Sequence, residues 1–177
     1  MRVAVFFPTA GEAETFRRRR PDAECVVTGV GPAAAAAAAA RTIVGLRPGI
    51  VLLAGIAGVY PASAFRVGDV VAVAEERVAG LPARYADRYR ATFVPDGVPQ
   101  AVSNSVVRPG APAEGADVEN MEGAAFFAVA AALGVPAGEL RAISNRVGRP
   151  FAEWRVAEAC EALAKELERV IEKLCDL

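Results

Sequence analysis

The sequence of 177 residues contains no histidine. Histidine is a common ligand of zinc enzymes and the usual base of a Ser-His-Asp triad, so its absence disfavours both kinds of site. Only three cysteines are present, an odd number without the paired spacing of a metal site or a disulfide framework. The sequence therefore predicts free thiols and no bound metal.

Net charge and long apolar runs are lacking as well. The 20 basic and 21 acidic residues leave a formal net charge of −1, which provides no electrostatic surface for nucleic acid. The basic run at residues 17–20 is better explained as a solvated helix end. Glycines and prolines interrupt the longest apolar runs before they could span a bilayer, and no signal-peptide pattern is seen. We expect a cytoplasmic protein with neither a nucleic-acid nor a membrane partner.

Apolar residues make up 54% of the chain, enough for the core of a single domain over residues 1–177. Apolar runs separated by glycine and proline predict alternating strands and helices. Strands are expected at residues 1–7, 24–28, 49–54, 69–74, 101–107 and 140–143, and helices after Thr9, after Pro32, at 123–133 and at 151–174. This order predicts an α/β fold in which helices flank a central, mostly parallel or mixed sheet. Ligands of such sheets bind beyond the carboxyl ends of the strands.

Residues 118–147 carry the strongest functional signal. Glu119 and Glu122 precede a helix that is apolar on every side and is therefore expected to be buried. The next strand ends at Ser144 and Asn145, which are expected in a turn. Polar groups at the start of a buried helix and at the end of a strand predict a binding site. Helix-dipole compensation by Glu122 and a turn-forming role for Asn145 are the simpler alternatives.

Two glycine-rich segments follow predicted strands. Residues 29–34 (GVGPAA) match the dinucleotide-binding pattern G-x-G-x-x-G/A, but Pro32 removes an amide that would face a pyrophosphate. The strand at 49–54 ends without the acidic residue that binds ribose in nicotinamide enzymes, so we expect no nucleotide cofactor. The second segment, residues 54–58 (AGIAG), is expected to be a turn that closes its strand.

The Met-Glu pair before the buried helix, the Ser-Asn pair after the next strand and the two glycine-rich segments resemble the purine nucleoside phosphorylase and nucleosidase family. The continuation at residues 146–154 is similar to futalosine hydrolases, nucleosidases of a menaquinone pathway. The resemblance covers residues 1–77 and 101–174 and implies a three-layer, nucleoside phosphorylase-like fold. It also implies a homo-oligomer, a dimer or a tetramer, that acts on a purine nucleoside without a metal or a cofactor.

The resemblance assigns a sugar site and a base for water activation. Met121 lies beneath the ribose and Glu122 binds its hydroxyls, since a carboxylate can accept two hydrogen bonds at once. Glu12 activates the attacking water, with Glu14 as the fallback. From its position alone, Glu12 is more simply a capping residue in the first turn of a helix. Glu119 is expected to be a solvated or capping residue.

The resemblance also implies a purine-base site and an acceptor. Gly55 and Ile56 border the substrate, but phosphorylases of the family carry an Arg and a Ser or Thr where this chain has Leu53 and Ile56. Aliphatic side chains supply no charge-assisted donor for phosphate, although backbone amides could still bind an anion. Water is therefore the expected acceptor. Asn145, which follows Ser144, can donate to O6 and accept from N7 of a departing hypoxanthine.

The function implied by the resemblance is hydrolysis of the N-glycosidic bond of futalosine, with release of hypoxanthine. A methylthioadenosine/adenosylhomocysteine-type nucleosidase, a purine nucleoside phosphorylase and a non-catalytic nucleoside-binding protein are the alternatives. The region 76–118 is short for the family, in which it supplies an aromatic residue that stacks on the base. Tyr85, Tyr89 and Phe93 are the available aromatic residues, and the sequence does not single out one of them. Arg141 is expected to be structural.

Overall fold

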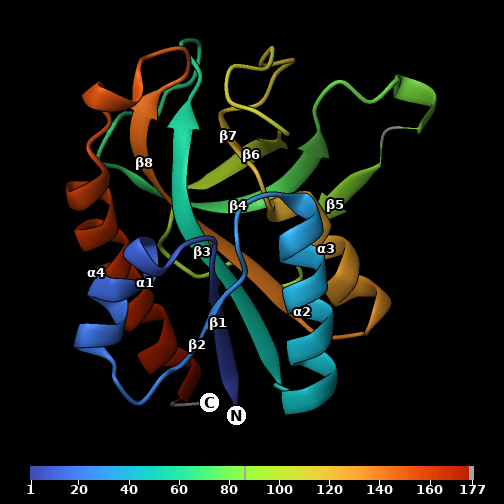
Figure 1. Cartoon of the computed structure of the whole chain (residues 1–177), viewed down its shortest axis with the longest axis vertical. Coiled ribbons are helices and arrows are strands. Elements are labelled where there is room, and N and C mark those ends of the chain that lie inside the picture. The colour runs from blue at the N-terminus through green and yellow to red at the C-terminus, as the bar shows by residue number, and fades with distance from the viewer. Residues whose placement is uncertain (86, 176–177) are drawn as a thin grey trace.

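The computed structural model describes residues 1–85 and 87–175, with helices packed on both faces of a mixed sheet (Figure 1). The strands are β1 (Val3–Phe7), β2 (Glu24–Val27), β3 (Ile50–Val59), β4 (Val70–Val78), β5 (Arg88–Arg90), β6 (Gln100–Ser105), β7 (Val118–Asn120) and β8 (Ala137–Arg146). The helices are α1 (Ala10–Arg19), α2 (Pro32–Leu46), α3 (Gly123–Ala132) and α4 (Val156–Cys175), with short 3-10 helices η1 (Ala83–Tyr85) and η2 (Phe151–Glu153). The predicted mixed α/β fold is confirmed.

The sheet closes on itself. Strand β3 pairs with β1 along the first part of one edge and with β8 along the other edge. The end of β3 also pairs with β7, and β8 also pairs with β4. Because β4 pairs with β6 and β6 with β7, the strands β3, β8, β4, β6 and β7 form a ring. One apolar cluster draws all its buried residues from these ring strands, so it packs the ring itself. The sequence did not predict this closure, because it depends on pairings between distant segments.

Alternation along β1 decides which helices cover which face. Val5 and Phe7 belong to a cluster with α1 and α4, whereas Ala4 and Phe6 pack in a second cluster with α2 and α3. In Figure 1, α1 and α4 accordingly lie together on one side of the sheet and α2 and α3 on the other. Successive side chains of a strand point to opposite faces, so both faces of β1 are buried.

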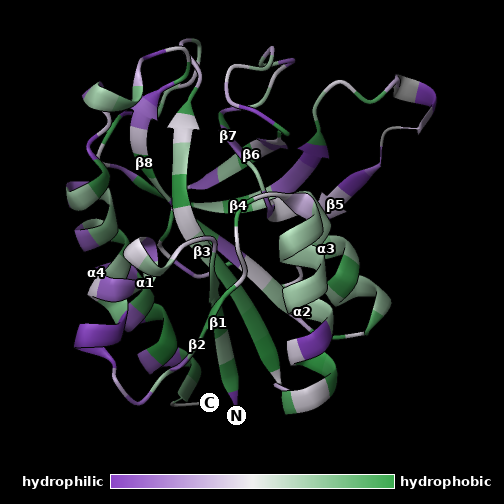
Figure 2. Ribbon diagram, viewed as in Figure 1, coloured by the Kyte–Doolittle hydropathy of each residue, from purple (hydrophilic) through white to green (hydrophobic). Residues whose placement is uncertain are grey.

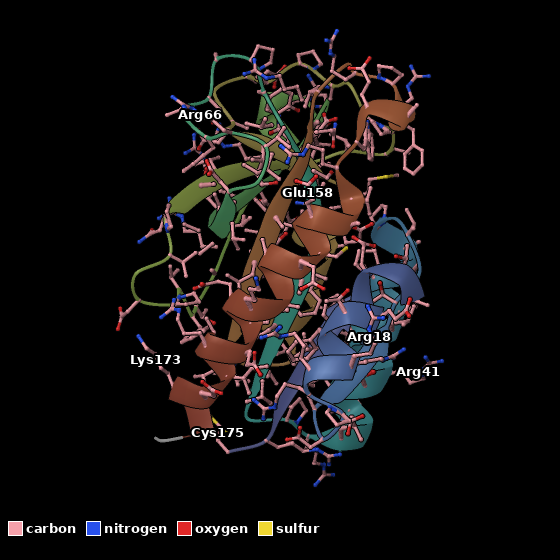
Figure 3. All side chains as sticks on the ribbon, turned by 90° about the vertical axis from the view of Figure 1, so that its left-hand side faces the viewer. Arg18, Arg41, Arg66, Glu158, Lys173 and Cys175 are labelled. Carbon is pink, nitrogen blue, oxygen red and sulfur yellow. The ribbon has the colours of Figure 1, made fainter. Side chains whose placement is uncertain are left out.

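The helices carry hydropathy patterns that match these positions (Figure 2). α3 is apolar throughout, whereas α4 alternates between hydrophobic and hydrophilic colours. On α4, Leu163 and Leu167 are buried and Glu158 and Lys173 are exposed. Figure 3 shows Glu158 of α4 and Arg18 of α1 on the side of the molecule away from the sheet. Among the described residues, every helix is too short or too polar to cross a bilayer.

The glycine-rich segment at residues 54–58 is not a turn, as the sequence predicted, but the second half of β3. This segment pairs with β8 as far as Val59 opposite Arg146, and its end also pairs with β7. Glycine has a low intrinsic preference for strands, but hydrogen-bonded neighbours on both sides override it. β8 is longer than predicted for the same reason, so Ser144 and Asn145 lie in a strand rather than in a turn.

The bounds of several other strands and helices also differ from the prediction, because the local sequence does not define where they begin and end. β4 continues to Val78, and the short strands β5 and β7 were not predicted. The last helix was predicted from residue 151, but residues 151–153 form the separate 3-10 helix η2 and α4 begins at Val156. Trp154 between them has an extended backbone, with φ −75° and ψ 133°.

Candidate active site

A cavity of about 270 Å³ opens where β1, β3 and β8 end and α3 begins. Seven residues were predicted to act in catalysis or substrate binding, and five of them line this cavity: Glu12, Ile56, Met121, Glu122 and Asn145. The other two lie directly behind its wall, Gly55 under Glu12 and Ser144 beside Asn145. The site therefore lies at the carboxyl ends of strands, where ligands of such sheets bind.

Glu12 points to the cavity, although it stands in the first turn of α1. Thr9 caps this helix, because its side chain accepts a hydrogen bond from the Glu12 amide at 3.2 Å. The Glu12 carboxylate does not complete a capping box. Instead its Oε2 accepts from the Thr9 hydroxyl at 2.6 Å and its Oε1 from the Ile56 amide at 2.9 Å. These two donors hold a carboxylate that is only 7% exposed.

Gly55 lets Glu12 and Arg141 approach each other. A Cβ atom at residue 55 would lie 2.6 Å from Arg141 Nη1 and 3.0 Å from Glu12 Oε1. The guanidinium and the carboxylate thus flank the same point on β3. Since real Cβ atoms essentially never show contacts below 3.0 Å, glycine is required here by the close approach.

Glu122 stands at the N-cap of α3 without capping it through its side chain. The first amides of the helix, those of Glu122 and Gly123, instead donate to Asn120 Oδ1 at 2.8 Å each. The Glu122 carboxylate accepts from the Gly31 amide at 3.0 Å and from Arg141 Nη2 at 3.3 Å. Asn120 thereby frees Glu122 from capping, and its buried carboxylate can face the cavity.

Arg141 is part of the cavity wall, which corrects its expected role as a purely structural residue. It is 1% exposed and donates to Glu139 Oε1 at 2.7 Å, Asn120 Oδ1 at 2.9 Å, Glu122 Oε2 and the Ile56 carbonyl. Burial alone would lower the pKa of Arg141, but the adjacent carboxylates of Glu139 and Glu122 raise it above its usual value. The sequence carried a signal for this role, because an arginine inside a buried apolar strand needs partners.

Glu119 is buried and lines the cavity, so its expected role as a solvated or capping residue is wrong. Its carboxylate accepts from the Tyr60 hydroxyl at 2.9 Å and from the Gly110 amide at 2.8 Å. Burial raises the pKa of Tyr60, which therefore remains a hydrogen-bond donor. Glu119 lies on β7, the three-residue strand that the sequence did not reveal.

Asn145 is held in one orientation by its neighbours. Its Oδ1 accepts from the Ser144 hydroxyl at 2.8 Å, and its Nδ2 donates to the Arg146 carbonyl at 3.1 Å. A flipped amide would place two acceptor oxygens, Oδ1 and the Arg146 carbonyl, against each other. This orientation leaves one lone pair on Oδ1 and one hydrogen on Nδ2 for a ligand.

The aromatic residues at the cavity come from η2 and its end, not from the region 76–118. Phe151 and Trp154 line the cavity with ring centroids 5.1 Å apart. Of the aromatic residues considered in the middle of the chain, Phe93 and Tyr89 pack against the two core clusters on opposite faces of the sheet. Tyr85 is 60% exposed and lies under the Arg84 guanidinium. Among the described residues, no group of three or more acidic or cysteine side chains is arranged to hold a metal ion.

Comparison with solved structures places the fold among nucleosidases. A 5'-methylthioadenosine nucleosidase from Arabidopsis thaliana has a TM-score of 0.85 at 19% identity, with 96% of this chain and 94% of that chain covered. A futalosine hydrolase mutant from Helicobacter pylori has a TM-score of 0.80 at 14% identity, with 98% and 99% covered. At these identities, the likeness shows the fold alone.

Sequence comparison adds the family. The phosphorylase superfamily model matches residues 100–175. A futalosine hydrolase from Thermus thermophilus is 53% identical over 58 residues, which are 32% of this chain and 26% of that protein. A futalosine hydrolase from Streptomyces coelicolor is 36% identical over 91% of this chain and 86% of its own length. Since that alignment spans most of both proteins, the chain belongs to the futalosine hydrolase family, within the phosphorylase superfamily.

Proposed function

We propose that this protein is a nucleosidase that hydrolyses the N-glycosidic bond of futalosine and releases hypoxanthine, a step of menaquinone biosynthesis. The observation that carries the proposal is the arrangement of Glu12 and Glu122 around Arg141, with Asn145 on the wall of the same cavity. This arrangement supplies a base, a sugar-binding carboxylate and an amide for the leaving group. The relatives named futalosine hydrolase support the same substrate.

The sugar end of the proposed site is Glu122 with Met121. Glu122 is oriented by the Gly31 amide and Arg141, and each of its oxygens keeps a lone pair for a ribose hydroxyl. Met121 is half-buried and contributes an adaptable apolar surface to the same wall. A pair of hydroxyls held in this way fixes the sugar relative to Glu12.

Glu12 is the proposed general base. Its two fixed donors hold the carboxylate in place, and Arg141 stands on the other side of Gly55. A water bound between the carboxylate and the guanidinium would lose a proton to Glu12 while it attacks an oxocarbenium-like ribosyl centre. Positioning and electrostatic stabilisation supply most of the rate in this mechanism.

Asn145 is the proposed contact to the leaving base. The free hydrogen on Nδ2 donates to O6 of hypoxanthine, and the free lone pair on Oδ1 accepts from protonated N7. Adenine carries an amine at position six, and the Nδ2 group of Asn145, itself a donor, cannot accept a hydrogen bond from it. This mismatch favours futalosine over methylthioadenosine, the substrate class of the alternative nucleosidase.

Water rather than phosphate is the proposed acceptor. Leu53 is fully buried in the core, and Ile56 presents an aliphatic side chain to the cavity. The Ile56 amide, which could have bound an anion, donates to Glu12 instead. Arg141 is the cation at this wall, but the Glu122 carboxylate already pairs with it and Glu139 already accepts from its Nε. These partners leave little positive charge to attract phosphate.

We also propose that the protein works as a homo-oligomer, with the dimer as the first choice. An apolar hollow of about 220 Å³ adjoins the cavity and shares Val106 and Met121 with it. Val107 in this hollow is 80% exposed, and a partner subunit seated on the hollow would cover it. Light scattering on the purified protein and on Val107→Asp distinguishes a dimer from a monomer; a monomeric wild type contradicts this assignment.

The test of the function is incubation in phosphate-free buffer with futalosine, inosine and methylthioadenosine. We expect hypoxanthine and a free sugar from futalosine, with slower release of adenine from methylthioadenosine. A strict requirement for phosphate would identify a phosphorylase instead, and purine binding without turnover would identify a non-catalytic protein.

The matched variants for the base are Glu12→Gln and Glu14→Gln. Glu14 lies on the same helix but is exposed and pairs with Arg18, at 3.8 Å. We expect Glu12→Gln to abolish turnover and to bind futalosine, and Glu14→Gln to behave like the wild type. Full turnover by Glu12→Gln would exclude Glu12 as the base.

A further inference from the structure

Two more acidic side chains lie behind the cavity, and neither lines it. Glu76 of β4 is 0% exposed and Glu139 of β8 is 1% exposed. A Cβ atom at Gly123 would lie 2.6 Å from Glu139 Oε2 and would also collide with Glu76 Oε1. The two carboxyl groups therefore lie side by side next to the first residue of α3.

The hydrogen bonds of this pair are unequal. Both oxygens of Glu76 have donors, because Oε2 accepts from the Ser105 hydroxyl at 2.7 Å and Oε1 from Asn120 Nδ2. Glu139 Oε1 accepts from Arg141 Nε at 2.7 Å. Glu139 Oε2 is the one buried side-chain nitrogen or oxygen without a partner in the described part of the chain. A carboxylate oxygen buried without a donor is costly, and a proton on that oxygen would remove the cost.

The charges around Glu139 point the same way. The charged groups facing it are Glu76 from β4, Glu122 at the start of α3 and Arg141 from its own strand. Three carboxyl groups thus share a single buried guanidinium. Burial and the nearby Glu76 carboxylate raise the pKa of Glu139 well above its ordinary value, despite the opposing effect of Arg141. Burial also raises the pKa of Glu76, while Ser105 and Arg141 oppose that shift.

We propose that Glu139 is a positioning residue that works in its protonated form, with the proton on Oε2 donated to Oε1 of Glu76. In this state Glu139 Oε1 holds Arg141 Nε, while Glu76 holds the amide of Asn120. Asn120 Oδ1 in turn bonds to Arg141 and to the first amides of α3, which carry Glu122. Glu139 and Glu76 thus fix the orientation of Arg141 directly and that of Glu122 through Asn120. The shared proton rests on the geometry, and its effect on catalysis rests on the proposed function.

The first test measures stability against pH and needs no substrate. The raised pKa of Glu139 means that its contribution to stability is fully present below the ordinary carboxyl pKa and is lost as the pH rises toward the folded-state pKa. In Glu139→Gln the amide keeps its hydrogens at every pH. We expect the Tm of this variant, relative to wild type, to rise by at least about 3 °C between pH 5 and pH 7.

The control for this measurement is Glu75→Gln on β4, next to Glu76. Partial burial acts to raise the pKa of Glu75, but Arg77, Arg88 and Arg90 lower it overall. Ionised Glu75 therefore stabilises the fold throughout the range from pH 5 to pH 7, which lies above the ordinary carboxyl pKa, so its replacement should lower the Tm by an amount that stays constant across this range. A Tm difference for Glu139→Gln that is flat with pH like that of the control, or that falls as the pH rises, overturns the shared proton.

The second test compares kcat/KM on futalosine for Glu139→Gln, Glu139→Ala and Glu76→Gln. The glutamine at 139 can accept from Arg141 and donate to Glu76, so we expect it to exceed the alanine variant by at least about tenfold. Glu76→Gln should be less active than Glu139→Gln, because an amide nitrogen would face a donor at either oxygen position. If Glu139→Gln were no more active than Glu139→Ala or than Glu76→Gln, the positioning role of protonated Glu139 would be overturned. If wild type does not cleave futalosine, the proposed function fails, and the melting comparison alone decides the proton.

Discussion

Gly55→Ala tests whether the spacing of Glu12 and Arg141 controls catalysis. The new methyl group would lie 2.6 Å from Arg141 Nη1, which is 0.8 Å short of the 3.4 Å at which ordinary contact begins. It would also press on Glu12 Oε1 at 3.0 Å and on Pro8 Cδ at 3.1 Å. Arg141 is held by four acceptors, so it cannot move without straining bonds to Glu139 and Asn120. A displacement of about 1 Å in a catalytic group costs on the order of 100-fold in rate.

We therefore expect Gly55→Ala to lower kcat/KM on futalosine by about 100-fold, with a loss of about 1–3 kcal/mol in the free energy of unfolding from overpacking. The measurements are steady-state release of hypoxanthine and urea unfolding. Gly45→Ala is the control, since Gly45 lies in α2 with no atom within 4 Å of its added Cβ, and alanine there should leave activity unchanged. Activity of Gly55→Ala within about twofold of wild type would refute the argument from spacing.

Three further substitutions test the same site. Asn145→Asp should shift the ratio of kcat/KM values from futalosine toward methylthioadenosine, because a carboxylate accepts from an amine at position six; an unchanged ratio contradicts the base assignment. Thr9→Ala removes the cap of α1 and a donor to Glu12, so thermal unfolding should show a loss of about 1 kcal/mol and kcat should fall. Tyr60→Phe leaves Glu119 Oε2 without its donor and should cost about 1–3 kcal/mol in urea unfolding, and a neutral result would show that water replaces the hydroxyl.

The layers of the fold could be predicted because they depend on local patterns. The apolar run of β1, the Pro32 start of α2 and the uniformly apolar α3 each indicate their element from a few residues. The second half of β3 could not be predicted in this way. Gly55 and Gly58 have the composition of a turn, and only β7 and β8, which follow some 60 to 90 residues later, keep the segment extended.

Part of the candidate site could be predicted, because a polar residue at the end of a buried helix or strand indicates a binding role. Glu122 and Asn145 stood at the ends of buried elements, and the cavity contains both. Arg141 and Glu139 were visible in principle, because residues two apart in a strand share a face and an acid beside a buried arginine forms its partner. Glu76 was not, since it lies beyond the predicted end of β4 and meets Glu139 only through the ring of strands.

The buried ionisable side chains of this protein are explained by the proposed reaction and not by a contribution to the stability of the fold. Five glutamates and one arginine are buried in the described part of the chain, an imbalance that desolvation makes unfavourable. Hydrophobic residues of similar volume in place of a buried ion pair often stabilise a protein, so selection for stability alone would have removed Glu122 and Arg141. They lie where the proposed mechanism needs a fixed guanidinium between a base and a sugar-binding carboxylate. The apolar clusters on both faces of the sheet offset the free energy that is lost when these ionisable side chains are removed from water.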